Sequence, residues 1–246
     1  MKRTLTFSIA LLLISFVSIA QEVMITPRLL YTQGKDVQQG KFEAGGIGFQ
    51  FEGFKTPESK LGLVVTGDWQ ISGTETKRID LNFNNSFGYT DVNYSSTMNK
   101  LTGGLIYVPL RGSFISPFVS VQGGVLWYRT KFYVNDPTNA DYCRPETNRN
   151  VKTSFALAGA AESGLKFRLK RKDAIRQLYA QVAVGYTLGT KASYIKLGDE
   201  PAGENTLPYT SKFRMSNGQT HSHVIGTMYR TRTSQLAYSV GVSFEL

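Results

Sequence analysis

Six charged residues stand at alternate positions in segments whose other positions are mostly apolar. They are Arg28, Glu52, Asp68, Glu162, Lys166 and Arg168. Neighbouring carboxylates can carry out general acid–base catalysis, whereas carboxylates beside cations can form ion pairs. Catalysis requires a cleft that admits a substrate, but buried ion pairs fill the space that they occupy. The elements that carry these residues therefore decide between the two kinds of chemistry.

The two histidines offer a second candidate site. His221 and His223 occur in THSHV, and in an extended chain both rings would lie on one face, where they could ligate a metal. No Asp or Glu lies near them in the sequence, and the spacing of Ser, His and acidic residues does not indicate an esterase. Cys143 is the only cysteine, so neither an internal disulfide nor a thiolate cluster can form. We expect no catalytic residues, no metal and no cofactor.

The surrounding segments have the pattern of half-buried strands, in which apolar and polar or small residues alternate. In the last of them, QLAYSVGVSFEL, every second residue from Leu236 to Leu246 is apolar and the residues between are small or polar. In LTGGLIYVPLR either set of alternate residues could face outward. Eight segments show the pattern: 23–31, 44–52, 61–72, 101–111, 116–130, 154–170, 177–189 and 235–246. Eight is an even number, as a closed antiparallel barrel in the bacterial outer membrane requires.

The lengths of the predicted connections also follow a pattern. In chain order they are 33–41, 53–60, 73–99, 112–116, 131–152, 170–176 and 190–232. Three odd-numbered connections are long and all even-numbered ones are short, as in transmembrane barrels with tight periplasmic turns and long extracellular loops. The fold class that we predict is all-β: an eight-stranded antiparallel up-and-down transmembrane β-barrel. Its third connection keeps some alternation in IDLNF and YTDVNY, so a hairpin that protrudes beyond the membrane is an alternative to a loop.

The N-terminal segment predicts export. Residues 1–20 combine Lys2 and Arg3, a short apolar run and small residues before Gln21, which is typical of a secretory signal peptide cleaved after Ala20. The predicted mature domain is 21–246, with the outer membrane as its location. The formal net charge of the chain is +10, which favours contact with anionic outer-membrane lipid or lipopolysaccharide; nucleic acid is not an expected partner.

At this point the chain resembles the small eight-stranded outer-membrane β-barrel proteins, porin-family barrels of the OmpA/OmpX type. The resemblance rests on YSVGVSFEL, on LIYVPL followed by SPFVSVQGGV, and on SFALAGAAESGLKFRL. It implies insertion by the outer-membrane barrel machinery through the C-terminal strand. Such barrels often end in an aromatic residue, whereas this chain has Leu246 last and Phe244 two places earlier.

In an eight-stranded barrel the lumen is just wide enough to be filled by side chains. The six charged residues face this lumen in our assignment, so we interpret them as a paired network that plugs it. Four further basic residues form a predicted periplasmic collar that either contacts phospholipid headgroups or is a solvated turn. The collar comprises Lys170, Arg171, Lys172 and Arg176. Aromatic residues in the long connections either form a binding surface or pack on one another.

These features favour a non-enzymatic outer-membrane barrel with a structural or surface-interaction role, which includes that of an accessory subunit of a larger outer-membrane assembly. A protein partner would meet the extracellular loops. The alternative is a narrow channel or a lateral-diffusion path for small hydrophobic molecules. A closed network of lumen charges argues against conduction, and a continuous water path along them argues for it.

Overall fold

The computed structural model describes residues 20, 22–34, 43–83, 86–134, 147–169, 177–198, 207–214 and 220–246. Among these residues no helix is long and apolar enough to cross a membrane. All regular elements described are antiparallel strands: β1 (Glu22–Gly34), β2 (Glu43–Phe54), β3 (Leu61–Phe83), β4 (Ser86–Tyr107), β5 (Ile115–Val134), β6 (Thr147–Arg168), β7 (Leu178–Leu197), β8 (Leu207–Arg214) and β9 (Thr220–Glu245).

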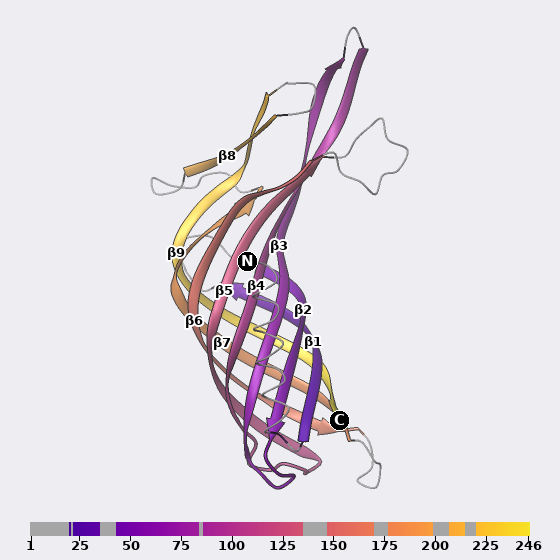
Figure 1. Cartoon of the computed structure of the whole chain (residues 1–246), viewed down its shortest axis with the longest axis vertical. Helices are drawn as coiled ribbons and strands as arrows, with labels where there is room; N and C mark the ends of the chain where they lie inside the picture. Colours follow the sequence, from indigo (N-terminus) through magenta and orange to yellow (C-terminus); the bar gives the residue numbers. More distant parts are fainter. Residues whose placement is uncertain are drawn as a thin grey trace.

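Eight of these strands form a closed barrel (Figure 1). Strands β1 to β7 pair in chain order, β7 pairs with β9, and β9 returns to β1, so that no edge remains in the ring. The β1–β9 register runs from Met24 opposite Glu245 to Gly34 opposite Gln235. Closure pairs the backbone groups of every strand, which is the condition for a sheet in hydrocarbon. The predicted eight-stranded antiparallel barrel is confirmed.

Alternation along the strands places apolar side chains on the outside of the barrel. Val121, Phe155 and Leu157 are 67–70% exposed, whereas Thr26 and Thr66, on the opposite face of their strands, are fully buried. The segment 101–111, whose parity was open, places Leu105 outward and Ile106 inward. The outer wall is therefore an apolar belt, and the lumen is lined by the other half of each strand.

The strands continue well beyond the predicted boundaries. The region 73–99 is not a loop, because β3 and β4 stay paired from Gly73 opposite Ser96 to Phe83 opposite Ser86. This matches the alternative of a protruding hairpin, which extends at the top of Figure 1. Likewise, the predicted connection 190–232 contains the ends of β7 and β9 and all of β8, which pairs only with β9. The sequence alternation of apolar residues fades in these segments, while their backbone pairing persists.

Two ends of the barrel can now be distinguished. At the short-turn end, residues 55–60 join β2 to β3 and residues 108–114 join β4 to β5. At the long-hairpin end, an apolar cluster draws strands from different parts of the ring together. This outer cluster comprises Val92, Tyr94, Phe132, Ile195 and Ile225, with Val151, Leu197 and Tyr209 packed against it. It joins β4, β5 and β6 to β7, β8 and β9 and so gives the extended strands a core of their own.

Candidate functional site

The lumen contains a charged side chain at a point where neighbouring strands leave room for it. Arg28 of β1 lies opposite Gly48 of β2 on one side and opposite Gly241 of β9 on the other. A Cβ at Gly48 would approach Asp68 Oδ1 to 2.2 Å, and one at Gly241 would lie 3.0 Å from the Arg28 Cβ. The two glycines therefore provide the space in which the long Arg28 side chain meets its partners.

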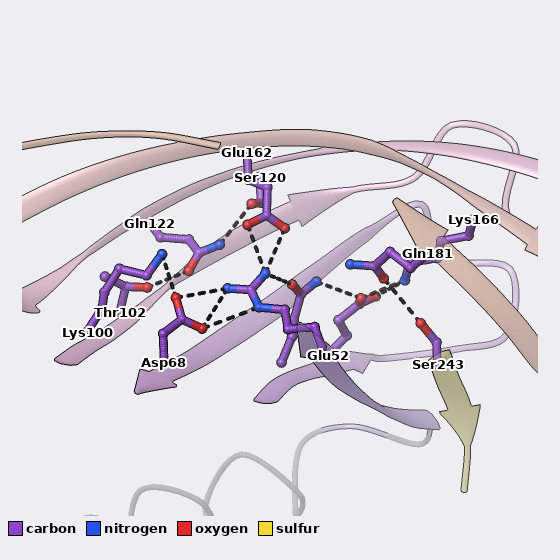
Figure 2. Close-up of polar contacts among 12 residues, drawn as sticks. Glu52, Asp68, Lys100, Thr102, Ser120, Gln122, Glu162, Lys166, Gln181 and Ser243 are labelled. Atoms are coloured by element: carbon purple, nitrogen blue, oxygen red, sulfur yellow. Dashed lines mark hydrogen bonds and ion pairs between the residues drawn. The ribbon is translucent and has the colours of Figure 1, made fainter. Parts of the chain in front are cut away.

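The Arg28 guanidinium links three other strands (Figure 2). Its Nη2 donates to Asp68 Oδ1 of β3 at 3.0 Å, and its Nη1 donates to Glu162 Oε2 of β6 at 2.9 Å. Nη1 also donates to Gln50 Oε1 of β2 at 2.9 Å. Arg28 is 4% exposed, so these bonds are shielded from water. A planar guanidinium suits this task because its five N–H groups can bind two carboxylates at once.

Two lysines complete the network. Lys100 Nζ of β4 lies 2.8 Å from Asp68 Oδ2, and Lys166 Nζ of β6 lies 2.6 Å from both carboxylate oxygens of Glu52. Gln50 connects the two parts, because its Nε2 donates to Glu52 Oε1 at 2.9 Å. The charged layer thus consists of Arg28, Glu52, Asp68, Lys100, Glu162 and Lys166. Three cations balance three carboxylates, which is the condition for burying such groups.

Uncharged polar side chains extend this layer across the lumen. Thr102 Oγ1 donates to Gln122 Oε1 at 2.7 Å, and Gln122 Nε2 donates to Ser120 Oγ at 2.9 Å. On the other side of the lumen, Ser243 Oγ donates to Gln181 Oε1 at 3.2 Å. Figure 2 shows these two chains flanking the charged residues. Each barrel strand except β7 contributes an ionised or hydroxyl side chain to this layer, and β7 contributes the amide of Gln181, so the layer involves the whole ring.

A second layer fills the lumen at the short-turn end and was missed by our sequence reasoning. This apolar layer comprises Met24, Phe54, Val64, Ile106, Val108, Phe118, Tyr179 and Ala183. Phe54, Val64 and Ile106 are at most 1% exposed. A cavity of about 90 Å³ beside the layer has room for a few water molecules only. The signal was present in Ile106 and Val108, which alternate with the outward residues of the segment 101–111.

Three tyrosines stack on one another toward the long-hairpin end. Gln235 Nε2 donates to Tyr128 Oη at 2.6 Å, and the Tyr128 ring stacks on Tyr194 at a centroid distance of 5.4 Å. Tyr194 in turn stacks on Tyr229 at 5.5 Å. These rings pack against one another, which agrees with the second interpretation of the loop aromatics.

The structure brings together five of the six predicted lumen residues. Arg168 does not join them: it lies opposite Tyr179 at the end of β6, and its Nε and Nη2 have no hydrogen-bond partner among the described residues. It is six residues beyond Glu162, or about 20 Å along the strand, and therefore too far from the central carboxylates. The third cation of the layer is Lys100, which pairs with Asp68 and was not among the predicted residues. Lys100 was missed because it lies just before the predicted strand 101–111.

Other predicted features fall partly or wholly outside the described residues. The signal peptide, the collar Lys170, Arg171, Lys172 and Arg176, and Cys143 lie there, so these remain predictions. The backbones of His221 and His223 belong to β9, opposite Phe213 and Ser211 of β8. In the described part of the chain, no three His, Cys, Asp or Glu side chains form a group that could hold a metal ion.

The chemistry open to the charged layer follows from its packing. Each carboxylate is occupied by a cation, and the side chains of Asp68 and Glu52 are fully buried. Among the described residues, apolar side chains pack on one side of this layer and tyrosines on the other, an arrangement that favours a plug over acid–base catalysis. Together, the buried and paired lumen charges, the closed ring of eight strands and the apolar outer wall describe one kind of fold. The chain has the fold of a small outer-membrane β-barrel.

Comparisons with known proteins return the same architecture at low similarity. No protein-family profile matches the chain, and no curated protein matches it. Among solved structures, the attachment invasion locus protein Ail of Yersinia pestis, in complex with the heparin analogue sucrose octasulfate, is 10% identical, with a TM-score of 0.41 and coverage of 92% of this chain and 98% of Ail. OprG of Pseudomonas aeruginosa is 14% identical, with a TM-score of 0.38 and coverage of 92% and 96%. A major outer membrane protein of Thermus thermophilus is 10% identical, with a TM-score of 0.41 and coverage of 92% and 100%. The fold assignment itself depends on the strand register of this chain.

Proposed function

We propose that this protein is a non-enzymatic integral protein of the bacterial outer membrane whose lumen is sealed and whose long-hairpin end is presented at the cell surface. The short-turn end then faces the periplasm. Three features support this placement: the closed ring, the belt of exposed apolar side chains, and the extension of β3, β4, β8 and β9 beyond one end only.

The observation that carries the proposal is the balanced charged layer. Its six ionised side chains span four neighbouring strands and β6, and all are at most 9% exposed. The apolar layer lies beneath it and the stacked tyrosines lie above it. A lumen filled in this way does not conduct ions, and the barrel then serves to anchor the protein in the membrane. Its role is then structural or interactive, exerted by the surface of the long-hairpin end on a partner or as an accessory part of a larger assembly.

Single-channel conductance tests the sealed lumen. We expect the wild-type protein, refolded into planar bilayers, to be silent. Glu162→Gln and Lys166→Met each leave the buried layer with one charge that is not balanced, and we expect this excess charge to draw water into the lumen and produce a leak. Lys77→Met, on the exposed part of β3, is the matched control and should remain silent. Steady conductance of the wild-type protein would instead support the alternative, a narrow channel.

A further inference from the structure

The backbone ladder between β6 and β7 ends at the upper edge of the apolar belt, where side-chain hydroxyl groups bridge the two strands instead. These two strands pair only up to Ala158 opposite Gly189. Beyond that level β6 continues with β5 as far as Thr147, and β7 continues with β9 as far as Leu197. A groove of about 800 Å³ lies at this seam, within the size range of ordinary ligand pockets, about 300–1,000 Å³. It is lined by Gly124, Leu157, Ala158, Gly159, Leu188, Gly189, Thr190, Lys191 and Arg232.

Hydroxyl side chains satisfy backbone groups where the ladder between the two strands ends. The Leu157 N–H donates to Thr190 Oγ1 at 3.1 Å, and the Ser193 N–H donates to Ser154 Oγ at 3.0 Å. Thr233 Oγ1 also donates to the Thr190 carbonyl at 3.2 Å. Unpaired backbone groups are costly at membrane depth, and these bonds satisfy some of those groups and hold the two strands together beyond the ladder. The groove is therefore a stable feature of the outer wall.

The charges around the groove are of one sign. In the described residues of β5, β6, β7 and β9 the only carboxylates are Glu162, inside the lumen, and Glu245, at the short-turn end. The long-hairpin halves of the same strands carry Arg129, Lys131, Arg149, Lys152, Lys191, Lys196, Arg230 and Arg232. Lys191 and Arg232 face each other across the β7–β9 pair and line the groove itself. This side of the barrel thus carries a basic rim directly above an apolar surface.

We propose that the groove binds a phosphorylated glycolipid of the outer leaflet, of the lipid A type. One acyl chain lies over Gly159 and between Leu157 and Leu188, both more than half exposed, and a phosphate group contacts Lys191 and Arg232. Small residues at the floor admit the chain, and the basic rim complements the anionic headgroup at the level where such headgroups lie. This inference rests on the proposed outer-membrane placement, but it does not depend on the sealed lumen.

The two tryptophans allow a direct test, because they lie on different sides of the barrel. Trp127 of β5 is two residues beyond Val125, which pairs with Leu157 of the groove, whereas Trp69 is on β3. Trp69→Phe and Trp127→Phe therefore leave one reporter each. In phosphatidylcholine vesicles containing bisphosphorylated lipid A with brominated acyl chains, we expect Trp127 to be quenched at an about tenfold lower lipid A fraction than Trp69. Dephosphorylated lipid A should remove this difference.

Two kinds of variant test the groove itself. Gly159→Leu fills it without a clash, since the nearest atom to a Cβ there is 4.0 Å away; Gly67→Leu on β3, with no atom within 4 Å, is its control. Lys191→Gln with Arg232→Gln removes the two basic side chains that line the groove, and Lys77→Gln with Arg78→Gln is the control for charge. We expect both groove variants, and neither control, to lose the selective quenching of Trp127.

Three results would overturn the proposal: equal quenching of both tryptophans, unchanged quenching in the groove variants, or equally selective quenching by brominated phosphatidylglycerol. Brominated phosphatidylcholine tests the membrane placement separately, because it should quench both tryptophans of any inserted barrel. If the lumen is not sealed, the conductance measurement would show it and the quenching experiments would not.

Discussion

The charged layer and the apolar layer fill the same lumen at neighbouring levels, yet they do so by opposite means. In the charged layer Arg28 holds Asp68 and Glu162 by directed bonds, and each group needs its counterpart. In the apolar layer Phe54 and Ile106 are held by packing alone. Ion pairs in such a site contribute little net stability compared with apolar packing, but their loss on one side is severe. The comparison suggests that the charged layer fixes the arrangement of the strands and the apolar layer excludes water.

The largest expected effect comes from removing the centre of the charged layer. Arg28→Met leaves Glu162 buried without a cation, while Asp68 keeps Lys100. We expect a loss of about 3–5 kcal/mol in the free energy of unfolding, measured by urea titration of the protein folded in lipid vesicles. Adding Glu162→Gln removes the orphaned charge and should restore part of the loss. An unchanged urea midpoint in Arg28→Met would show that the carboxylate does not need its partner.

Side chains alternate between the two faces of a strand, and this alternation determines how much of the charged layer could be predicted from the sequence. Arg28, Glu52, Asp68, Glu162 and Lys166 were found because a polar residue between apolar neighbours must face away from lipid. Lys100 was not found, because the polar sequence before Leu101 shows no apolar alternation, although the backbone pairing continues through it. Alternation also cannot say how far along the lumen a residue lies, and this is why Arg168 was placed with carboxylates that it does not reach.

The apolar layer was harder to predict for a different reason. Alternation in a barrel contrasts lipid with lumen, and an apolar residue on the lumen face, such as Val64 or Ile106, weakens that contrast. The seam between β6 and β7 was not predictable at all from this period. It depends on the register at which the pairing of Ala158 with Gly189 ends, which is a property of two distant segments.

A smaller effect is expected from a comparable change in the apolar layer. Ile106→Val removes one buried methylene group, which should lower the free energy of unfolding by about 1 kcal/mol in the same urea titration. The charged layer remains intact, so the protein should stay silent in planar bilayers. Ile47→Val, on the lipid-facing side of β2, is the matched control and should change little, because lipid fills the space. A leak in Ile106→Val would mean that the apolar layer, rather than the charges, is the weaker seal.

The smallest expected effect concerns the ion pair of Lys77 with Glu75, which lies outside the lumen. It tests whether the strength of an ion pair depends on its distance or on its burial. Lys77 Nζ lies 2.5 Å from Glu75 Oε1, whereas Lys100 Nζ lies 2.8 Å from Asp68 Oδ2, so distance alone ranks the outer pair as the stronger. The Lys77 side chain is 40% exposed and that of Lys100 is 9% exposed. Water screens the outer pair, so Lys77→Gln should lower the free energy of unfolding by at most about 0.5 kcal/mol. This loss should be smaller still at high salt, because salt screens the pair further. Lys100→Gln should cost several times more and depend little on salt. Equal losses in the two variants would show that the lumen is accessible to water, and the contrast between the plugged barrel and its exposed extension would then be wrong.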